Sequence, residues 1–157
     1  MNREVSRPLG VPRFVPVLTP LIKVFLRLGI PMGPNVLLTT RGRKTGKSRT
    51  TPVALMKLHD RKFLLATFGE VNWVRNLRAT QEAQVGKGGH RDTFRVKELA
   101  PEIAAPLFKE ILTPYLNSRM MRSFLSTGYN LGPKSSDEDF LREALRHPMF
   151  ELISQTK

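Results

Sequence analysis

The chain of 157 residues has no cysteine, and its three histidines are scattered. Without cysteine there is no disulfide framework, no thiolate nucleophile, no iron–sulfur cluster and no Cys-type zinc site. His59, His90 and His147 form no HExxH pair, and none lies four residues from another. We therefore expect no metal site.

Long apolar runs are also missing. No stretch approaches the roughly 20 residues of a transmembrane helix, and no small-residue cleavage site follows a long apolar segment. With 40% hydrophobic and 25% charged residues, the chain is nevertheless suited to a globular fold, and its length predicts a single domain. The lack of cysteine is compatible with a reducing compartment, and we expect a cytoplasmic protein.

Acidic residues are scarce in the N-terminal part. The net charge is +13, and residues 1–50 carry ten basic side chains but only one acid, Glu4, whereas residues 101–157 carry seven of each sign. This excess of positive charge favours an anionic partner: nucleic acid, an anionic membrane surface, or a phosphorylated or polycarboxylate cofactor.

Hydrophobic periodicity predicts short strands joined by hairpins, with a few helices. Strands are expected at residues 36–40, 50–58, 62–67, 83–87, 90–99 and 149–153, and helices at 72–80, 101–112, 113–127 and 136–146. Pro106 is expected to disturb the helix around it. Because the strands do not alternate with helices, a doubly wound sheet is disfavoured. We predict an α+β fold in which peripheral helices surround a small antiparallel barrel.

An amphipathic helix is predicted before the first strand. After Pro12, Pro16 and Pro20, the segment from Leu21 to Leu28 has an apolar face, with Lys23 and Arg27 on its polar side. Two roles stay open, packing on the domain's own core and lying against an anionic membrane surface on the cytoplasmic face. We divide the chain into an N-terminal arm, residues 1–34, and a barrel, residues 35–157.

The loop between the first two strands is a candidate anion site. Residues 41–49 contain five cations, two glycines, two hydroxyls and no acid. Glycines let backbone N–H groups turn toward an anion, and the side chains supply further donors. A P-loop is excluded because only three residues separate Gly42 from Gly46, where that motif needs four.

The segments LLTTRGRKTGKSRTTPVAL, FGEVNWVRNLRA and RHPMFEL together resemble the deazaflavin-dependent nitroreductase family. The resemblance implies a split β-barrel related to FMN-binding oxidoreductases, and binding of coenzyme F420, a deazaflavin that carries a phosphate and an oligoglutamate tail. It also implies an enzyme that delivers hydride to an electron-poor acceptor such as a quinone or nitroaromatic, and it is compatible with a homodimer.

The resemblance also assigns site residues. Around the cofactor's phosphate and acidic tail it places Arg43, Lys44, Thr45, Gly46, Lys47 and Arg49. Against the ring system it places Pro52, Val53 and Ala54, with Thr67, Phe68 and Gly69 at a nearby turn. From the short helix it adds Asn72, Trp73, Asn76 and Leu77, although Trp73 also suits a core position and Asn76 a hydrogen bond to the adjacent loop. Tyr115 and Tyr129 are candidate catalytic residues.

One departure from the family pattern concerns residues 67–70. Family members often have Ser-Lys-Gly-Gly there, whereas this chain has Thr-Phe-Gly-Glu, so an aromatic side chain and the acid Glu70 replace a cation. Other functions stay open from the sequence: an FMN or flavin-like ligand in the same barrel, a non-catalytic carrier of the cofactor, and a basic nucleic-acid-binding module. The last is disfavoured because aromatic residues are not interleaved with the basic ones.

Overall fold

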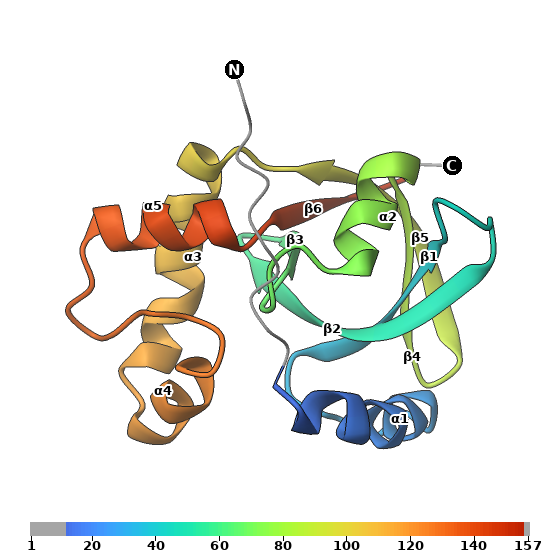
Figure 1. The fold of residues 1–157 in the computed structure, drawn as a ribbon, viewed down its shortest axis with the longest axis horizontal. Coiled ribbons are helices and arrows are strands. Elements are labelled where there is room, and N and C mark those ends of the chain that lie inside the picture. Colours follow the sequence, from blue (N-terminus) through green and yellow to red (C-terminus); the bar gives the residue numbers. More distant parts are fainter. Residues whose placement is uncertain (1–11, 156–157) are drawn as a thin grey trace.

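The computed structural model describes residues 12–155, which form a barrel flanked by helices (Figure 1). The strands are β1 (Asn35–Arg41), β2 (Ser48–Leu58), β3 (Arg61–Leu65), β4 (Glu82–Lys87), β5 (His90–Glu98) and β6 (Met149–Ser154). The helices are α1 (Phe14–Arg27), α2 (Asn72–Thr80), α3 (Pro101–Leu116), α4 (Arg119–Leu125) and α5 (Asp137–Arg146). This is the predicted α+β fold.

The six strands close into an antiparallel barrel in the order β1-β2-β3-β6-β5-β4. Both predicted tight turns are present, since His59 and Asp60 have positive φ angles between β2 and β3, as do Gly88 and Gly89 between β4 and β5. Buried and exposed residues alternate along β4, so that Ala83 and Val85 point into the barrel. The hairpins thus follow from the local sequence, whereas closure by β6 joins β3 to β5 across the whole chain.

Two hydrophobic clusters lie on the two sides of β3 and β6. Inside the barrel, Val74 and Leu77 of α2 pack with strand residues such as Phe150. Outside it, α3 and α5 cover the sheet through residues such as Phe108 and Phe140. In Figure 1 the three helices α3, α4 and α5 accordingly lie together on one side of the barrel. The space between this helical layer and the barrel wall is where a ligand site can form.

The prediction for residues 101–127 was wrong in its boundaries. One helix, α3, continues through Pro106 and Pro114 to Leu116, and the shorter α4 begins only at Arg119. Burial of the apolar face of α3 outweighs the backbone hydrogen bonds that its prolines remove. The break comes at Ser118, whose side chain caps α4 by accepting from the Met121 N–H at 3.5 Å.

The N-terminal helix begins earlier than predicted, at Phe14. Pro16 lies in its first turn, where backbone N–H groups have no intrahelical partner, and Pro20 is tolerated inside the helix. Leu26 is completely buried, and its carbonyl accepts from the Gly88 N–H at 2.9 Å, so the C-terminal end of α1 is fixed to the barrel. The N-terminal arm that was predicted for residues 1–34 includes residues 1–11, which lie outside the described part of the chain.

Candidate active site

A largely apolar cavity of about 210 Å³ lies between the barrel wall and the helical layer. The barrel side includes six residues that were predicted for the ring system, the nearby turn or the short helix: Pro52, Val53, Ala54, Thr67, Phe68 and Trp73. On the opposite side are the two predicted tyrosines, Tyr115 and Tyr129. Segments far apart in the sequence therefore meet around one cavity.

Helix α4 completes the cavity, which was not predictable from the sequence. Met121, Phe124 and Leu125 line the wall that α4 provides, together with Leu112 from α3. Apolar residues at helical spacing are typical of core positions, so nothing in their pattern distinguishes a cavity wall from a core. No residue of α4 is fully buried, so this wall is the least firmly packed.

The basic loop joins β1 to β2 as a tight, exposed hairpin. The Gly42 N–H donates to the Lys47 carbonyl and the Gly46 N–H to the Gly42 carbonyl, both at 2.8 Å. Gly46 has a φ of 68°, which side-chain-bearing residues rarely adopt, and it allows the chain to turn there. Within residues 12–155, none of the five cations of this loop has an ion-pair partner. The loop presents uncompensated positive charge to solvent.

Asn76 of α2 holds the base of this loop. Its Oδ1 accepts from the backbone N–H of Arg43 at 3.3 Å and from the Arg43 guanidinium at 3.1 Å. Its Nδ2 donates to the Thr40 hydroxyl at 3.3 Å. This geometry matches the open alternative from the sequence, a hydrogen bond to the adjacent loop, and it makes Asn76 a support of the basic loop.

The loop and the cavity are connected by β2. Arg49 lies at the start of this strand and Pro52 three residues further on, a separation of about 10 Å at the usual rise of a strand. One elongated ligand can therefore place an apolar ring in the cavity and an anionic portion on the loop. A deazaflavin with a phosphate and a glutamate tail has this distribution of polarity, so the residues present fit the cofactor that the sequence resemblance implies.

Thr67 and Tyr129 bring two hydroxyl groups together at the cavity wall. Their oxygens are 3.3 Å apart, and Tyr129 is 4% exposed. Burial raises the pKa of Tyr129 to about 12, and the nearby Glu143 carboxylate adds to this rise against the effect of the Thr67 hydrogen bond. The phenol therefore stays protonated at neutral pH and can donate a hydrogen bond. The hydroxyl of Tyr115, by contrast, has no polar partner among residues 12–155.

Glu70, the unexpected acid of the turn, is neutralised by the protein itself. It is buried and paired with Arg78, whose guanidinium also makes bonds of 2.7 and 2.8 Å to Glu98. These carboxylates raise the pKa of Arg78 against the effect of burial. Glu70 consequently adds no free negative charge to a site that is predicted to bind an anion.

Besides the basic loop, four predicted residues do not line the cavity: Asn76, which supports the loop, and Gly69, Asn72 and Leu77. Leu77 is completely buried in the barrel core, because its position on α2 faces the strands. Gly69 is buried in the turn after β3, and Asn72 is exposed at the start of α2. Their neighbours Phe68 and Trp73 are the residues of these two segments that reach the cavity.

Solved structures with low sequence identity share the fold. One, described as a domain-swapped dimer, is 18% identical over 85% of this chain and 94% of its own length, with a TM-score of 0.50. The protein Atu2129 from Agrobacterium tumefaciens, of unknown function, is 15% identical over 96% of this chain and 60% of its own, with a TM-score of 0.53. An F420-H2 dependent reductase, FDR-A, is 20% identical over 76% and 93%, with a TM-score of 0.47.

The comparison with sequence families is more specific. No curated protein matches the chain. The family model of the F420H(2)-dependent quinone reductases, however, matches residues 26–123, which is more than half of the chain and includes the basic loop, α2 and most of the cavity. This match confirms the predicted deazaflavin cofactor and the predicted reductase class. The chain belongs to the F420H(2)-dependent quinone reductase family.

Proposed function

We propose that this reductase passes reducing equivalents from F420H2 to a quinone-type acceptor bound in the apolar cavity. The main support for this proposal is that β2 connects the two parts of the site. The strand begins beside the basic loop, at Arg49, and continues into the apolar cavity wall formed by Pro52, Val53 and Ala54. A quinone fits the remaining wall, which is formed by aromatic and aliphatic side chains of α3 and α4.

Each part of the site has a separate role in this proposal. Lys44, Lys47 and Arg49, with the Thr45 hydroxyl, bind the phosphate and glutamates; Gly46 provides the turn between them, and Arg43 is oriented by Asn76. When bound, the cofactor supplies the hydride. The protein holds the deazaflavin and quinone rings in contact and excludes water from them. Most of the catalytic effect of such a site comes from this positioning.

The acceptor also needs a hydrogen-bond donor for the oxygen that gains negative charge. Tyr129 and Thr67 both line the cavity, their hydroxyl oxygens are 3.3 Å apart, and the raised pKa of Tyr129 keeps its phenol protonated at neutral pH. A donor aimed at a developing oxyanion in a dry site stabilises the transition state. We assign this role to Tyr129, with Thr67 beside it and Tyr115 as a further wall of the acceptor site. A nitroaromatic presents similar oxygens and is a second acceptor class.

The apolar face of α1 supports contact with a membrane surface. Phe14, Val17, Leu21, Val24 and Leu28 are 48–76% exposed on this helix, which also carries the cations Lys23 and Arg27. Met120 and Phe124 of α4 are exposed as well, and α4 and α1 lie at the same end of the molecule in Figure 1. No helix within residues 12–155 has the length and apolarity to cross a bilayer. We propose that α1 lies on an anionic lipid surface.

The direct test is turnover of F420H2 with a soluble quinone, measured as the change in cofactor absorbance. A nitroaromatic serves as the comparison acceptor, and FMN serves as the comparison cofactor. We expect quinone-dependent oxidation of F420H2, and a Tyr129→Phe variant that binds the cofactor normally but turns over at least tenfold more slowly. Binding of F420 without reduction of any quinone would contradict the proposed acceptor.

The exposed apolar face of α1 could instead join two copies of the chain. Sedimentation of the same preparation distinguishes a dimer from a monomer.

A further inference from the structure

A buried pair formed by Glu143 of α5 and His147, the residue that follows this helix, lies directly behind the cavity wall. Glu143 is 2% and His147 is 0% exposed, and His147 Nε2 is 3.0 Å from Glu143 Oε2, one helical turn away. Neither residue lines the cavity. Removing such polar groups from water costs free energy, so the pair contributes little net stability unless further hydrogen bonds complete it.

The hydrogen-bond partners fix the orientation of the pair. His147 Nδ1 is 2.9 Å from the Ala66 carbonyl oxygen, which can only accept, so Nδ1 carries a proton. Burial alone raises the pKa of Glu143, but the hydrogen bond of His147, the Asn130 N–H and the Arg146 guanidinium outweigh it, and the net pKa is lowered. The imidazole ring is thus held at both nitrogens, by Ala66 on one side and by Glu143 on the other.

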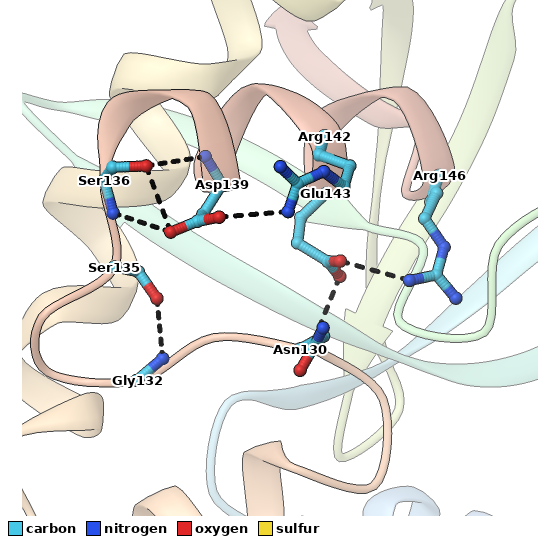
Figure 2. A network of polar contacts seen from close by, with 8 residues as sticks. All are labelled: Asn130, Gly132, Ser135, Ser136, Asp139, Arg142, Glu143 and Arg146. Atoms are coloured by element: carbon cyan, nitrogen blue, oxygen red, sulfur yellow. Dashed lines mark hydrogen bonds and ion pairs between the residues drawn. The ribbon is translucent and has the colours of Figure 1, made fainter.

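The pair reaches the two segments that carry the cavity hydroxyls. Ala66, held by His147, directly precedes Thr67. Asn130, whose N–H donates to Glu143 Oε2 at 3.3 Å, directly follows Tyr129 (Figure 2). The rings of Tyr129 and His147 also lie against each other, with their centroids 4.3 Å apart. Each hydroxyl-bearing residue is thus one peptide away from a hydrogen bond to the pair.

The same two segments touch each other at Gly128. A Cβ atom at this position would lie 2.7 Å from Thr67 Cγ2, closer than Cβ atoms approach their neighbours, and 3.1 Å from the Thr67 carbonyl oxygen, which is a tight contact. Any larger residue at Gly128 would therefore push Thr67 away, whereas glycine keeps Tyr129 within reach of the Thr67 hydroxyl. The buried pair and this contact constrain the same two hydroxyls from two sides.

We propose that Glu143 and His147 are positioning residues that hold the hydroxyls of Thr67 and Tyr129 in the orientation needed to donate to the acceptor oxygen. The inference rests on the proposed function for the nature of that acceptor, but the positioning itself is a property of the chain without ligand. The groups that face the pair are the Ala66 carbonyl, the Asn130 N–H, Arg146 and Tyr129.

NMR of the full chain without cofactor tests the positioning. We expect Glu143→Gln to shift the Thr67 and Tyr129 resonances, because it alters the partner of His147 and Asn130. Unmoved Thr67 and Tyr129 resonances in a folded Glu143→Gln variant would overturn the proposal. If that variant does not fold, Glu143→Asp, which shortens the side chain and keeps the carboxylate, is measured in its place, and unmoved resonances there overturn the proposal equally.

A double-mutant cycle tests whether the pair acts through Tyr129. Glu143→Gln should lower kcat with F420H2 and quinone about tenfold with little change in the cofactor Kd, and should have little further effect in a Tyr129→Phe background. Glu110→Gln is the matched control, because Glu110 forms an exposed pair with His59 at 2.6 Å on the protein surface. Equal effects of Glu143→Gln in both backgrounds overturn the inference. A wild-type protein without turnover contradicts the proposed function instead, and the NMR result then decides the inference alone.

Discussion

At the scale of single residues, the cations of the β1–β2 loop repel one another until an anion binds between them. We expect Lys44→Ala and Arg49→Ala each to weaken binding of F420 by about one to two powers of ten, because each removes one charge-assisted contact worth roughly 1.5 to 3 kcal/mol. The melting temperature should stay nearly unchanged, because both side chains are exposed and unpaired within residues 12–155. Quenching of Trp73, the chain's only tryptophan, which lines the cavity, measures the binding.

A matched control exists on the same strand. Lys57 is an exposed cation near the far end of β2, and Lys57→Ala removes the same charge from the molecule without touching the loop. It should leave the affinity for F420 within about twofold of the wild-type value, since an exposed charge at a distance is screened by salt. Equal losses in all three variants would mean that net charge, and not the loop, binds the cofactor.

Glu143 predicts a dependence of stability on pH. Its pKa is lowered from the ordinary value of 4.5, so its ionised form stabilises the folded state above that pH, and this contribution is lost as the pH falls below 4.5. At pH 7 Glu143→Gln should cost about 3 kcal/mol of unfolding free energy, because it removes a buried carboxylate that accepts from Asn130 and Arg146 and contacts His147. Chemical denaturation from pH 7 to pH 3 should show this difference shrinking. A difference that stays constant with pH would contradict the assignment.

At the scale of the elements, α1 tests the proposed membrane contact. Val17 and Leu21 are 76% and 50% exposed, so Val17→Glu and Leu21→Glu should leave the melting temperature unchanged. Each should weaken binding to anionic liposomes at least tenfold, because burial of such a side chain in an apolar phase contributes about 1.5 to 3 kcal/mol. Ile103→Glu, at an equally exposed apolar position on α3, is the control and should bind liposomes normally. Liposome binding that survives both α1 substitutions would rule out this face.

Helix α4 is the cavity wall that is easiest to displace. It has seven residues, none of them fully buried, whereas the neighbouring α3 buries six. We expect the amides of α4 to exchange hydrogen quickly in the free protein and more slowly once cofactor and quinone are bound, with α3 protected in both states. Hydrogen exchange followed by mass spectrometry measures this. Unchanged exchange in α4 would show that the acceptor does not contact this wall.

The elements also show what local sequence can and cannot determine. Strand and turn positions were predictable because alternation and turn residues such as Gly88 and Gly89 act over a few residues. The continuation of α3 beyond Leu112 and through Pro114 was not, because it depends on burial of residues such as Leu116 in the outer core. The barrel wall of the cavity was found through family motifs, whereas Phe124 and the buried pair at His147 are defined only by the packing of distant segments.

At the scale of the whole molecule, the net charge of +13 is distributed so that residues 1–50 are strongly positive and residues 101–157 are balanced. We propose that this distribution matches the two parts of one ligand, with the ring of the cofactor in the apolar cavity and its anionic portion on the loop of residues 41–49. The two contributions therefore respond differently to salt, since the screening length falls from about 30 Å at 0.01 M to about 3 Å at 1 M.

The most direct test of the account is the affinity for F420 and for the same deazaflavin without phosphate and glutamates, measured by Trp73 quenching between about 0.01 M and about 1 M salt. We predict that F420 binds more tightly at low salt and loses most of this advantage at high salt, while the tail-less deazaflavin binds with nearly constant affinity. In Arg49→Ala the salt dependence for F420 should become weaker. Equal affinity and equal salt dependence for the two ligands would contradict the claim that the loop of residues 41–49 binds the anionic part of the cofactor.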